Sequence, residues 1–555
     1  MPLLFRSFAH WRPTDLRGDL IAGATLAAIA VPEQMATAGL AGFSPAFGFY
    51  AFIVGSVAFA VFGAGRFVSV GADSTIAPIF AGALAAVAAT GSPSYVELAA
   101  TLALMVGAAL VAAGIFRLGW VSNLLSVPVT TGFLAGIAVH IAVSQIPLLL
   151  GTAAGQGTLL ERIAGIAASA GHANVFDVSL GLGVLAIALV CEKTSAQIPG
   201  ALIGLVLATL IVVLLHLEHR GVATIGPIAL ASPHFGLAAV APAALSRLAA
   251  LAFIVSLIVM MQTAATLEAF AGSNDPPDIN RDFIGVGVGS IVSGLIGGFA
   301  LNASPPRTAL VKESGGRSQL SGLLAAAILG ALLVAGPGLF AHVPKAALGG
   351  VLLFVALRIT RVSNMVEVFR QAFAEFLLIV ATIAAIVILP IELGVGVGIF
   401  LSLAHGVWTT TRAGVIALER VPGTSIWWPP TSASSGETID GILVLAFQAP
   451  LSFLNANDFR REFLTQLERA AKPLTAVILE ASNVIEIDFT GAEVLRHLVM
   501  TCGASGIPLY IARLESLRAQ AALRRFGILQ LLGENHSFLS VQDAVDAVLS
   551  EPRPR

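Results

Sequence analysis

The sequence predicts two folds in one chain, a polytopic all-α membrane domain followed by a small α/β domain. Of its 555 residues, 57% are hydrophobic and only 11% are charged, whereas soluble domains average roughly 25% charged residues. Between residues 20 and 160 the only charged side chains are Glu33, Arg66, Asp73, Glu97 and Arg117. From about residue 412 onward, charges recur at the density of a soluble protein. This contrast predicts a lipid environment for the first part and an aqueous one for the second.

Apolar segments follow one another along the first 411 residues. A helix needs about 20 mostly apolar residues to cross a bilayer, and by that measure we count about fourteen candidate spans, several of them short. The pieces at 306–316 and 346–358 are too short to cross alone. The candidate spans lie near residues 18–38, 43–63, 73–91, 97–116, 125–150, 177–191, 199–216, 244–270, 283–299, 306–316, 319–341, 346–358, 373–390 and 391–411.

Two of the segments are interrupted in a way that is typical of transporters with inverted repeats. One interruption lies at residues 69–75 (SVGADST) and the other at residues 301–308 (LNASPPRT). Each predicts a short extended stretch followed by a helix start, and Pro305 and Pro306 suit the first turn of a helix. In inverted-repeat transporters such discontinuous helices mark the binding site. The alternative is that both are ordinary Gly/Pro kinks in packed helices.

Basic residues at both ends of the apolar region predict its orientation. Arg6, Arg12 and Arg17 precede the first span, and Arg412 and Arg420 follow the last one. Because basic residues favour the cytoplasmic side, both ends are expected there, which requires an even number of spans. The N-terminus lacks the apolar run of a cleavable signal, so we expect the first span to be retained.

The remainder of the chain predicts a linker and a soluble domain. We place the membrane transport domain at residues 1–418, a Pro/Ser/Gly-rich linker at 419–437 and the soluble domain at 438–555. Strands that alternate with helices predict a small α/β domain. We expect strands at 442–447, 476–479 and 508–511, and helices near 456–470, 490–503, 515–525 and 541–549.

Several classes of function are not expected. The net charge of −2 argues against a nucleic-acid partner, and Cys191 and Cys502 fall in different regions and are not expected to pair. The sequence has no Gly-rich phosphate loop, metal-ligand spacing or nucleophile–base pair, so we expect neither an enzyme nor a bound cofactor or metal. His140 is expected to be a satisfied core residue.

Four stretches in the right order resemble the sulfate permease (SulP) family of anion transporters. Three are similar to motifs of the family's first, fifth and tenth membrane segments, and the fourth resembles a loop of the STAS domain, which sulfate transporters share with anti-sigma-factor antagonists. The stretches are residues 32–36 (PEQMA) with 41–50 (AGFSPAFGFY), 125–133 (LSVPVTTGF), 307–309 (RTA) and 487–491 (IDFTG).

The resemblance implies a seven-plus-seven inverted repeat, divided into a core and a gate subdomain. It implies secondary active transport of a small anion, of the sulfate, bicarbonate or dicarboxylate class, by alternating access. The anion would lie between the half-helices of spans three and ten. A homodimer in the bacterial inner (cytoplasmic) membrane is expected, with both termini cytoplasmic. An uncoupled anion channel or exchanger, a membrane anchor for a signalling STAS module and a nucleobase carrier are the alternatives.

The residues at the two interruptions form the predicted anion site. Helix N-termini offer free N–H donors and a partial positive charge, and small side chains let an anion approach the backbone. Arg307 adds a full positive charge, which is costly at membrane depth unless it is paired or functional; the alternative is an interfacial arginine that reaches the surface. The candidate substrate-binding residues are Gly71, Ala72, Ser74, Ala303, Ser304, Arg307 and Thr308.

Two acids are candidates for proton coupling. Glu33 lies in an apolar span, where the cost of desolvating a carboxylate makes its protonation accessible; the alternative is a structural pair with a nearby arginine. Asp73 could take part or could cap the half-helix. The family's usual first-span Tyr is Thr37 here. Gln262 replaces an acid that is frequent in the eighth span, which weakens the case for a sodium site or a second proton site.

The soluble domain contributes one candidate. The resemblance implies that Thr490 corresponds to the hydroxyl residue that is phosphorylated in some STAS domains. The favoured alternative is that Thr490 is the N-cap of the helix that begins there.

Overall fold

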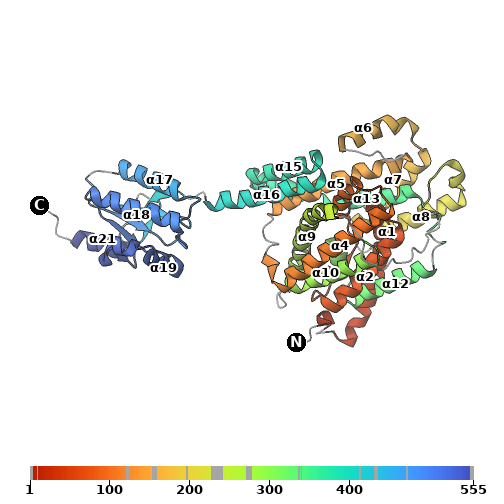
Figure 1. Ribbon diagram of the computed structural model, residues 1–555, viewed down its shortest axis with the longest axis horizontal. Helices are drawn as coiled ribbons and strands as arrows, with labels where there is room; N and C mark the ends of the chain where they lie inside the picture. Colours follow the sequence, from red (N-terminus) through yellow and green to blue (C-terminus); the bar gives the residue numbers. More distant parts are fainter. Residues whose placement is uncertain are drawn as a thin grey trace. The chain divides into compact units, whose positions relative to one another are not determined.

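The computed structural model describes residues 4–8, 11–120, 126–152, 159–195, 198–226, 242–270, 278–335, 338, 340–411, 414–430, 436–470 and 473–550. They form two compact units, residues 1–403 and 404–555, each with its own hydrophobic core (Figure 1). Leu125 of the expected fifth-span motif and Arg412 of the orientation argument lie outside the described residues.

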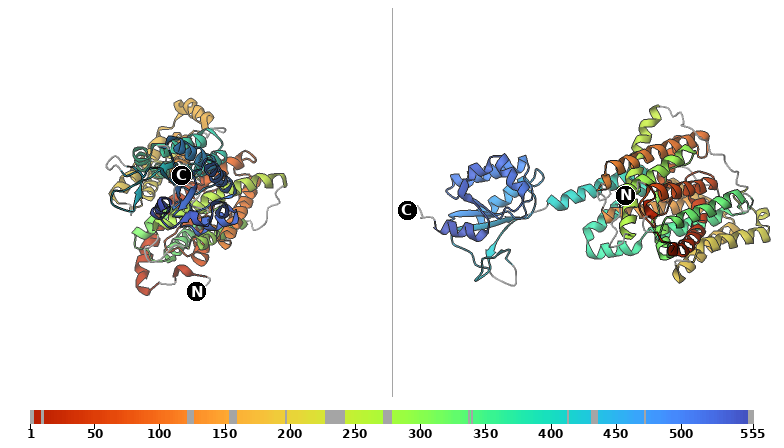
Figure 2. Two further views of the ribbon diagram at one scale, coloured as in Figure 1. Left: turned by 90° about the vertical axis from the view of Figure 1, so that its left-hand side faces the viewer. Right: turned by 90° about the horizontal axis from the view of Figure 1, so that it is seen from below.

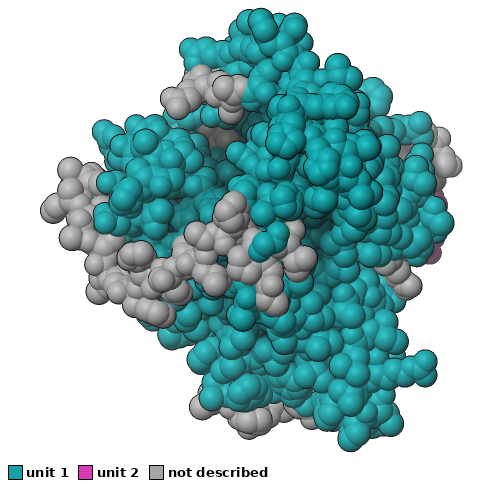
Figure 3. Space-filling view, turned by 90° about the vertical axis from the view of Figure 1, so that its right-hand side faces the viewer, with its two compact units in different colours: residues 1–403 teal, residues 404–555 magenta. Residues whose placement is uncertain are grey.

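The first unit is helical, as predicted. Each of the fourteen predicted spans overlaps a helix. Among the described residues, seven helices are long and apolar enough to cross a membrane, and four further apolar helices are shorter. Figure 3 shows residues 1–403 in space-filling form, in teal.

Its helices pack in two groups. The first group surrounds the two interrupted segments and contains α1 (Leu16–Leu40), α2 (Pro45–Phe62), α3 (Ala77–Ala85), α4 (Pro93–Ile115), α9 (Pro242–Phe270), α10 (Ile279–Leu295), α11 (Pro305–Glu313) and α12 (Leu320–Ala335). The second contains α5 (Val127–Leu150), α6 (Leu159–Ser169), α7 (Val175–Thr194), α8 (Gly200–Leu214), α13 (Lys345–Ile359), α14 (Val362–Gln371) and α15 (Phe373–Ile388). Helix α1 joins the groups by packing against α8 and α13. Helix α16 (Ile391–Thr411) begins next to α15. These groups fit the expected core and gate.

Glycines allow the helices of the first group to approach closely. A Cβ on Gly107 of α4 would lie 2.6 Å from the carbonyl oxygen of Gly287 on α10, and a Cβ on Gly287 would lie 2.8 Å from that of Gly107. On α2, a Cβ on Gly48 would lie 2.1 Å from the backbone oxygen of Gln34. Small residues at such crossings let membrane helices pack backbone to backbone. The Gly48 crossing fixes α1 beside the interrupted segments.

Helices α6 and α14 were not predicted. Both are short and amphipathic, and both contain charged residues, such as Glu161 and Arg162 in α6 and Glu367 and Arg370 in α14. A search for long apolar segments therefore passes over them. His140 is half-buried and has a hydrogen-bond partner, with Nε2 2.8 Å from the backbone oxygen of Ile386.

The second unit is the predicted α/β domain. Its five-stranded sheet has the order β3-β6-β7-β8-β9; β3 is antiparallel to β6, and the other neighbours are parallel. One face packs against α17–α20 and the other against α21 (Figure 2). The strands are β3 (Val415–Ala417), β6 (Ile442–Phe447), β7 (Ala476–Glu480), β8 (Leu509–Ala512) and β9 (Ser537–Phe538). The helices are α17 (Ala456–Arg469), α18 (Phe489–Ala504), α19 (Leu517–Arg525), α20 (Ile528–Leu532) and α21 (Val541–Ser550).

Short strands lie in and beside the expected linker. Strand β3 lies before residue 418, and β4 (Glu419–Arg420) pairs with β5 (Trp427–Trp428) inside the expected linker 419–437. Both cysteines are free, as predicted. Burial raises the pKa of the Cys502 thiol to about 11, so this thiol is inert at neutral pH.

Candidate functional site

The two interrupted segments lie side by side in the middle of the first group of helices. Strand β1 (Val70–Gly71) pairs antiparallel with β2 (Asn302–Ala303), with Val70 opposite Ala303 and Gly71 opposite Asn302. The backbone N–H of Ser304 adds a 2.9 Å hydrogen bond to the oxygen of Ser69. A half-helix follows each strand, α3 after β1 and α11 after β2. The predicted extended stretches and helix starts are therefore confirmed, and the alternative of ordinary kinks is wrong.

Prolines determine where α11 begins and how many donors it offers. Pro305 and Pro306 form its first two positions, as predicted. Because proline has no N–H, these two positions contribute no backbone donor. The N–H of Thr308 is already bonded to the oxygen of Ser304 at 3.0 Å. The start of α11 thus offers its partial positive charge with fewer free N–H groups than an ordinary helix end.

Two polar side chains hold Ala72, the residue after β1. The side-chain amide of Gln34 on α1 bonds it twice: Nε2 donates to the oxygen of Ala72, and the N–H of Ala72 donates to Oε1, both at 2.9 Å. Arg307 donates from Nη1 to the same oxygen at 3.2 Å. Gln34 was not predicted as a site residue. The one feature of the sequence that could have indicated Gln34 is its place in an apolar span, directly after the polar residue Glu33.

Arg307 is enclosed by the protein. The residue is 1% exposed, Nη1 lies 2.6 Å from Oε1 of Glu33, and Nε donates to Oγ of Ser69 at 3.2 Å. The guanidinium carbon is 6.0 Å from the centre of the Phe52 ring. Nη2 is buried and has no hydrogen-bond partner among the described residues. This burial is incompatible with an interfacial arginine that reaches the surface.

Glu33 is the ion-pair partner of Arg307, the arrangement named above as the alternative to a free carboxylate. Its side chain is 13% exposed, while that of Arg307 is fully buried. Glu33 thus presents one side to the cavity and the other to a buried cation.

Asp73 and Gln262 connect the two segments through Thr75. Oδ1 of Asp73 accepts hydrogen bonds from the N–H of Thr75, at 3.0 Å, and from its hydroxyl. That hydroxyl also lies 2.9 Å from Oε1 of Gln262 on α9, which accepts from the side-chain amide of Asn302 on β2. Since a hydroxyl has one proton, Thr75 can donate to Asp73 or to Gln262, not to both. Asp73 thus caps the turn before α3, which itself begins only at Ala77.

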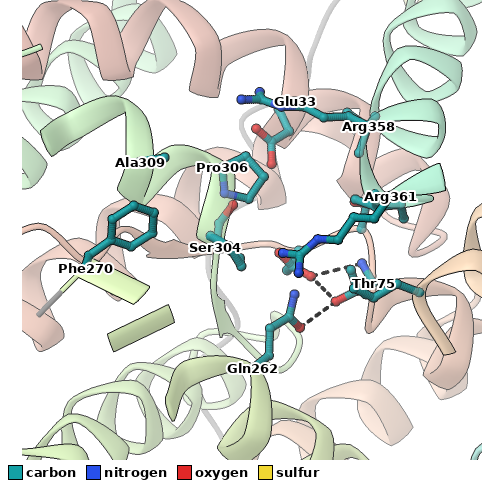
Figure 4. Close-up of a pocket in the computed structure, with 15 residues that line it drawn as sticks. Glu33, Thr75, Gln262, Phe270, Ser304, Pro306, Ala309, Arg358 and Arg361 are labelled. Carbon is teal, nitrogen blue, oxygen red and sulfur yellow. Dashed lines mark hydrogen bonds between the residues drawn. The ribbon is translucent and has the colours of Figure 1, made fainter. Parts of the chain in front are cut away.

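A cavity of about 250 Å³ lies where α3 and α11 begin (Figure 4). Four predicted residues line it: Glu33, Asp73, Ser74 and Ser304. The other predicted substrate-binding residues, namely Gly71, Ala72, Ala303, Arg307 and Thr308, are buried and are not among the lining residues. These five residues lie behind the lining residues, in the β1–β2 pair and the hydrogen bonds around it. The remaining lining residues are Thr75, Leu134, Gln262, Phe270, Pro305, Pro306, Ala309, Val355, Arg358, Ile359 and Arg361.

The two arginines in that set were not predicted from the sequence. Arg358 lies in the last turn of α13, and Arg361 lies between α13 and α14. Nε of Arg358 is 3.2 Å from Oε1 of Glu192 on α7. In the sequence Arg358 marks only the end of a short apolar segment, and no motif indicates that it faces α3 and α11 across a cavity.

The expected role of Thr490 as a helix cap is wrong. The N-cap of α18 is Asp488, whose Oδ1 accepts a 2.7 Å hydrogen bond from the N–H of Gly491. Asp488 takes this role because its backbone is extended just before the helix begins. Thr490 is exposed in the first turn, so phosphorylation of Thr490 stays a prediction.

Comparison with known proteins identifies the family. The model of the sulfate permease family matches residues 16–382, which include both interrupted segments and every residue that lines the cavity. The chain belongs to the sulfate permease family. The STAS domain model matches residues 435–544, so this family member carries a C-terminal STAS domain. Its family places it among transporters, not enzymes.

Relatives that match nearly the whole chain are also named as sulfate transporters. A protein named "Probable sulfate transporter" from Mycobacterium tuberculosis (strain H37Rv) is 32% identical over 541 residues, which cover 97% of this chain and 96% of the relative. The chloroplastic sulfate transporter 4.1 of Arabidopsis thaliana is 28% identical, with 96% of this chain and 80% of the relative covered.

Solved structures share the fold. The structure of SLC26A9 matches 99% of this chain with a TM-score of 0.89 at 20% identity, and 93% of the SLC26A9 chain is covered. The transmembrane domain of BicA, a cyanobacterial bicarbonate transporter, matches 72% of this chain and all of its own, with a TM-score of 0.63 at 24% identity.

Proposed function

We propose that this protein is a secondary active transporter that moves a small anion into the cell by alternating access, coupled to protons. The observation that carries the proposal is the β1–β2 pair, because it aligns the starts of α3 and α11 at one cavity. Two helix N-termini at one site favour a negatively charged ligand. The names of the relatives point to sulfate, bicarbonate or a related oxyanion as substrate.

Uptake into proteoliposomes tests this function. The purified full chain is reconstituted, and entry of radiolabelled sulfate, bicarbonate or a C4-dicarboxylate is measured with the outside made acidic or kept at the internal pH. We expect an anion of this set to accumulate above its external concentration only when the outside is acidic. If none of these anions enters faster than into protein-free liposomes, the proposal is refuted.

An uncoupled exchanger or channel is the second candidate, and the ion pair between Glu33 and Arg307 favours it. Glu33 is held 2.6 Å from the guanidinium of Arg307, so its carboxylate can serve the fold as an ion-pair partner and need not take part in proton coupling. An exchanger would carry labelled anion into liposomes that are preloaded with unlabelled anion, whatever the pH difference. Entry that is driven equally well without a pH difference would support this candidate and exclude proton symport.

We further propose a homodimer in the bacterial inner membrane with both termini in the cytoplasm. The basic residues that precede α1 support this orientation. Protease treatment of intact spheroplasts and of inverted vesicles tests it, because only inverted vesicles should lose the STAS domain. Cross-linking in native membranes tests the dimer.

Removal of the second unit should separate binding from efficient transport. A protein that ends after Thr411 keeps every residue of the cavity wall, since all of them lie before residue 362. We expect the anion dissociation constant to stay within about threefold of the full-length value, while the transport rate or the folded yield falls. Isothermal titration of both purified proteins measures the binding. Complete loss of binding would contradict this division of roles.

A further inference from the structure

Arg358 and Arg361 face the cavity from the second group of helices, and they differ in their partners. Arg358 is held by Glu192. Arg361 has no ion pair within the part of the chain that the structure describes. Figure 4 shows its side chain extending into the cavity toward Thr75 and Gln262, which belong to the first group of helices.

The other charged side chains at the cavity already have partners within the described residues. Arg307 and Glu33 form a pair, and Asp73 accepts two hydrogen bonds from Thr75. The starts of α3 and α11 offer roughly half an elementary charge each, and no full charge. Among the cations that the structure describes at this cavity, Arg361 is therefore the one without an ion pair, and it is also exposed, so an entering anion can reach its guanidinium without breaking an existing ion pair.

The backbone of Arg361 supports a functional role. Its φ is 45° and its ψ is 51°, in the left-handed region. Residues other than glycine rarely adopt this conformation, and its cost persists only where the surrounding structure imposes it. The turn lies between α13 and α14, and the oxygen of Arg361 accepts the N–H of Asn364 at 3.0 Å. A glycine would fit this backbone better, yet the chain has an arginine there.

We propose that Arg361 binds the transported anion directly and makes the site prefer divalent over monovalent anions. This inference rests on the proposed function. A guanidinium can donate two parallel hydrogen bonds to an oxyanion. A divalent anion gains more from the full charge of Arg361 than a monovalent one, because Coulomb energy scales with the product of the charges. The bound anion would also connect the first group of helices, through α3 and α11, to the second.

Arg361→Gly tests the proposal without straining the fold, because glycine adopts this backbone freely. Sulfate and chloride affinities of the purified full chain are measured by isothermal titration, and folding is checked by the melting temperature. We expect the sulfate dissociation constant to rise roughly 10- to 100-fold, the range for a lost charged hydrogen bond. Chloride affinity should fall less, and the melting temperature should stay the same or rise. Arg361→Lys should recover part of the sulfate affinity.

Arg370→Gly is the control, since Arg370 is exposed on α14 and does not line the cavity. Its sulfate affinity should match that of the wild type. Unchanged sulfate affinity in a well-folded Arg361→Gly protein would overturn the proposal, and so would equal losses for sulfate and chloride. If the wild-type protein itself binds and transports no anion, the proposed function has failed instead.

Discussion

Arg307→Met should lower the free energy of unfolding of the first unit by about 3–5 kcal/mol, the range for breaking a buried ion pair by removal of one partner. The substitution leaves Glu33 without its cation and removes the bonds from Arg307 to Ser69 and Ala72. Methionine has a similar volume, so the loss reports charge and hydrogen bonding and not an empty cavity. Thermal unfolding in detergent, with and without substrate, measures it.

Two further variants make this test specific. Glu33→Gln combined with Arg307→Met should recover much of the stability, because neither charge is then left unpaired. Lys312→Met is the control on the same helix, since Lys312 is exposed and its loss should cost little. An Arg307→Met protein as stable as the wild type would mean that the ion pair contributes nothing to the fold.

Glu33→Gln should abolish proton-driven accumulation of the anion while leaving anion binding. Glutamine keeps the shape of the side chain and can still accept a hydrogen bond from Arg307, yet it does not titrate. It therefore imitates a permanently protonated Glu33. In proteoliposomes with an acidic exterior we expect accumulation to fall to the level seen without a pH difference, while exchange of labelled for unlabelled anion continues.

The control for this experiment is Glu97→Gln. Glu97 is an exposed acid on α4 that does not line the cavity, so its loss should leave accumulation unchanged. Accumulation by Glu33→Gln at the wild-type rate would show that Glu33 is not the coupling residue. Asp73 would then be tested in the same way, by Asp73→Asn.

The sequence predicted the interrupted segments because glycine and proline disturb a helix locally, wherever the rest of the chain lies. It also predicted the central strands β6, β7 and β8, whose apolar runs are long enough to recognise. Strands β3 and β9 have three and two residues, too few for a pattern, and their pairing depends on the sheet already present.

The ion pair and the arginines of the second group could not be predicted in the same way. Glu33 and Arg307 are 274 residues apart in sequence, so only the folded arrangement of α1 and α11 brings them together. From the sequence, an ion pair between Glu33 and an arginine was a possible alternative, but the sequence did not indicate which arginine would be the partner. The place of Arg361 is harder still to predict from the sequence. It lies in the turn between α13 and α14, and the position of that turn at the cavity depends on how the helices pack.

The strand pair also has a consequence for biosynthesis. Ala72 and Arg307, which meet at that pair, are separated by 235 residues of chain. At roughly 5–20 residues per second, a ribosome needs roughly 12–47 s to extend the chain from one to the other. During that interval the backbone groups of β1 lack their final partners, and an unpaired peptide group in hydrocarbon costs several kcal/mol. The nascent first half must therefore keep this stretch in contact with water, or with the insertion machinery, until the second half arrives to complete it.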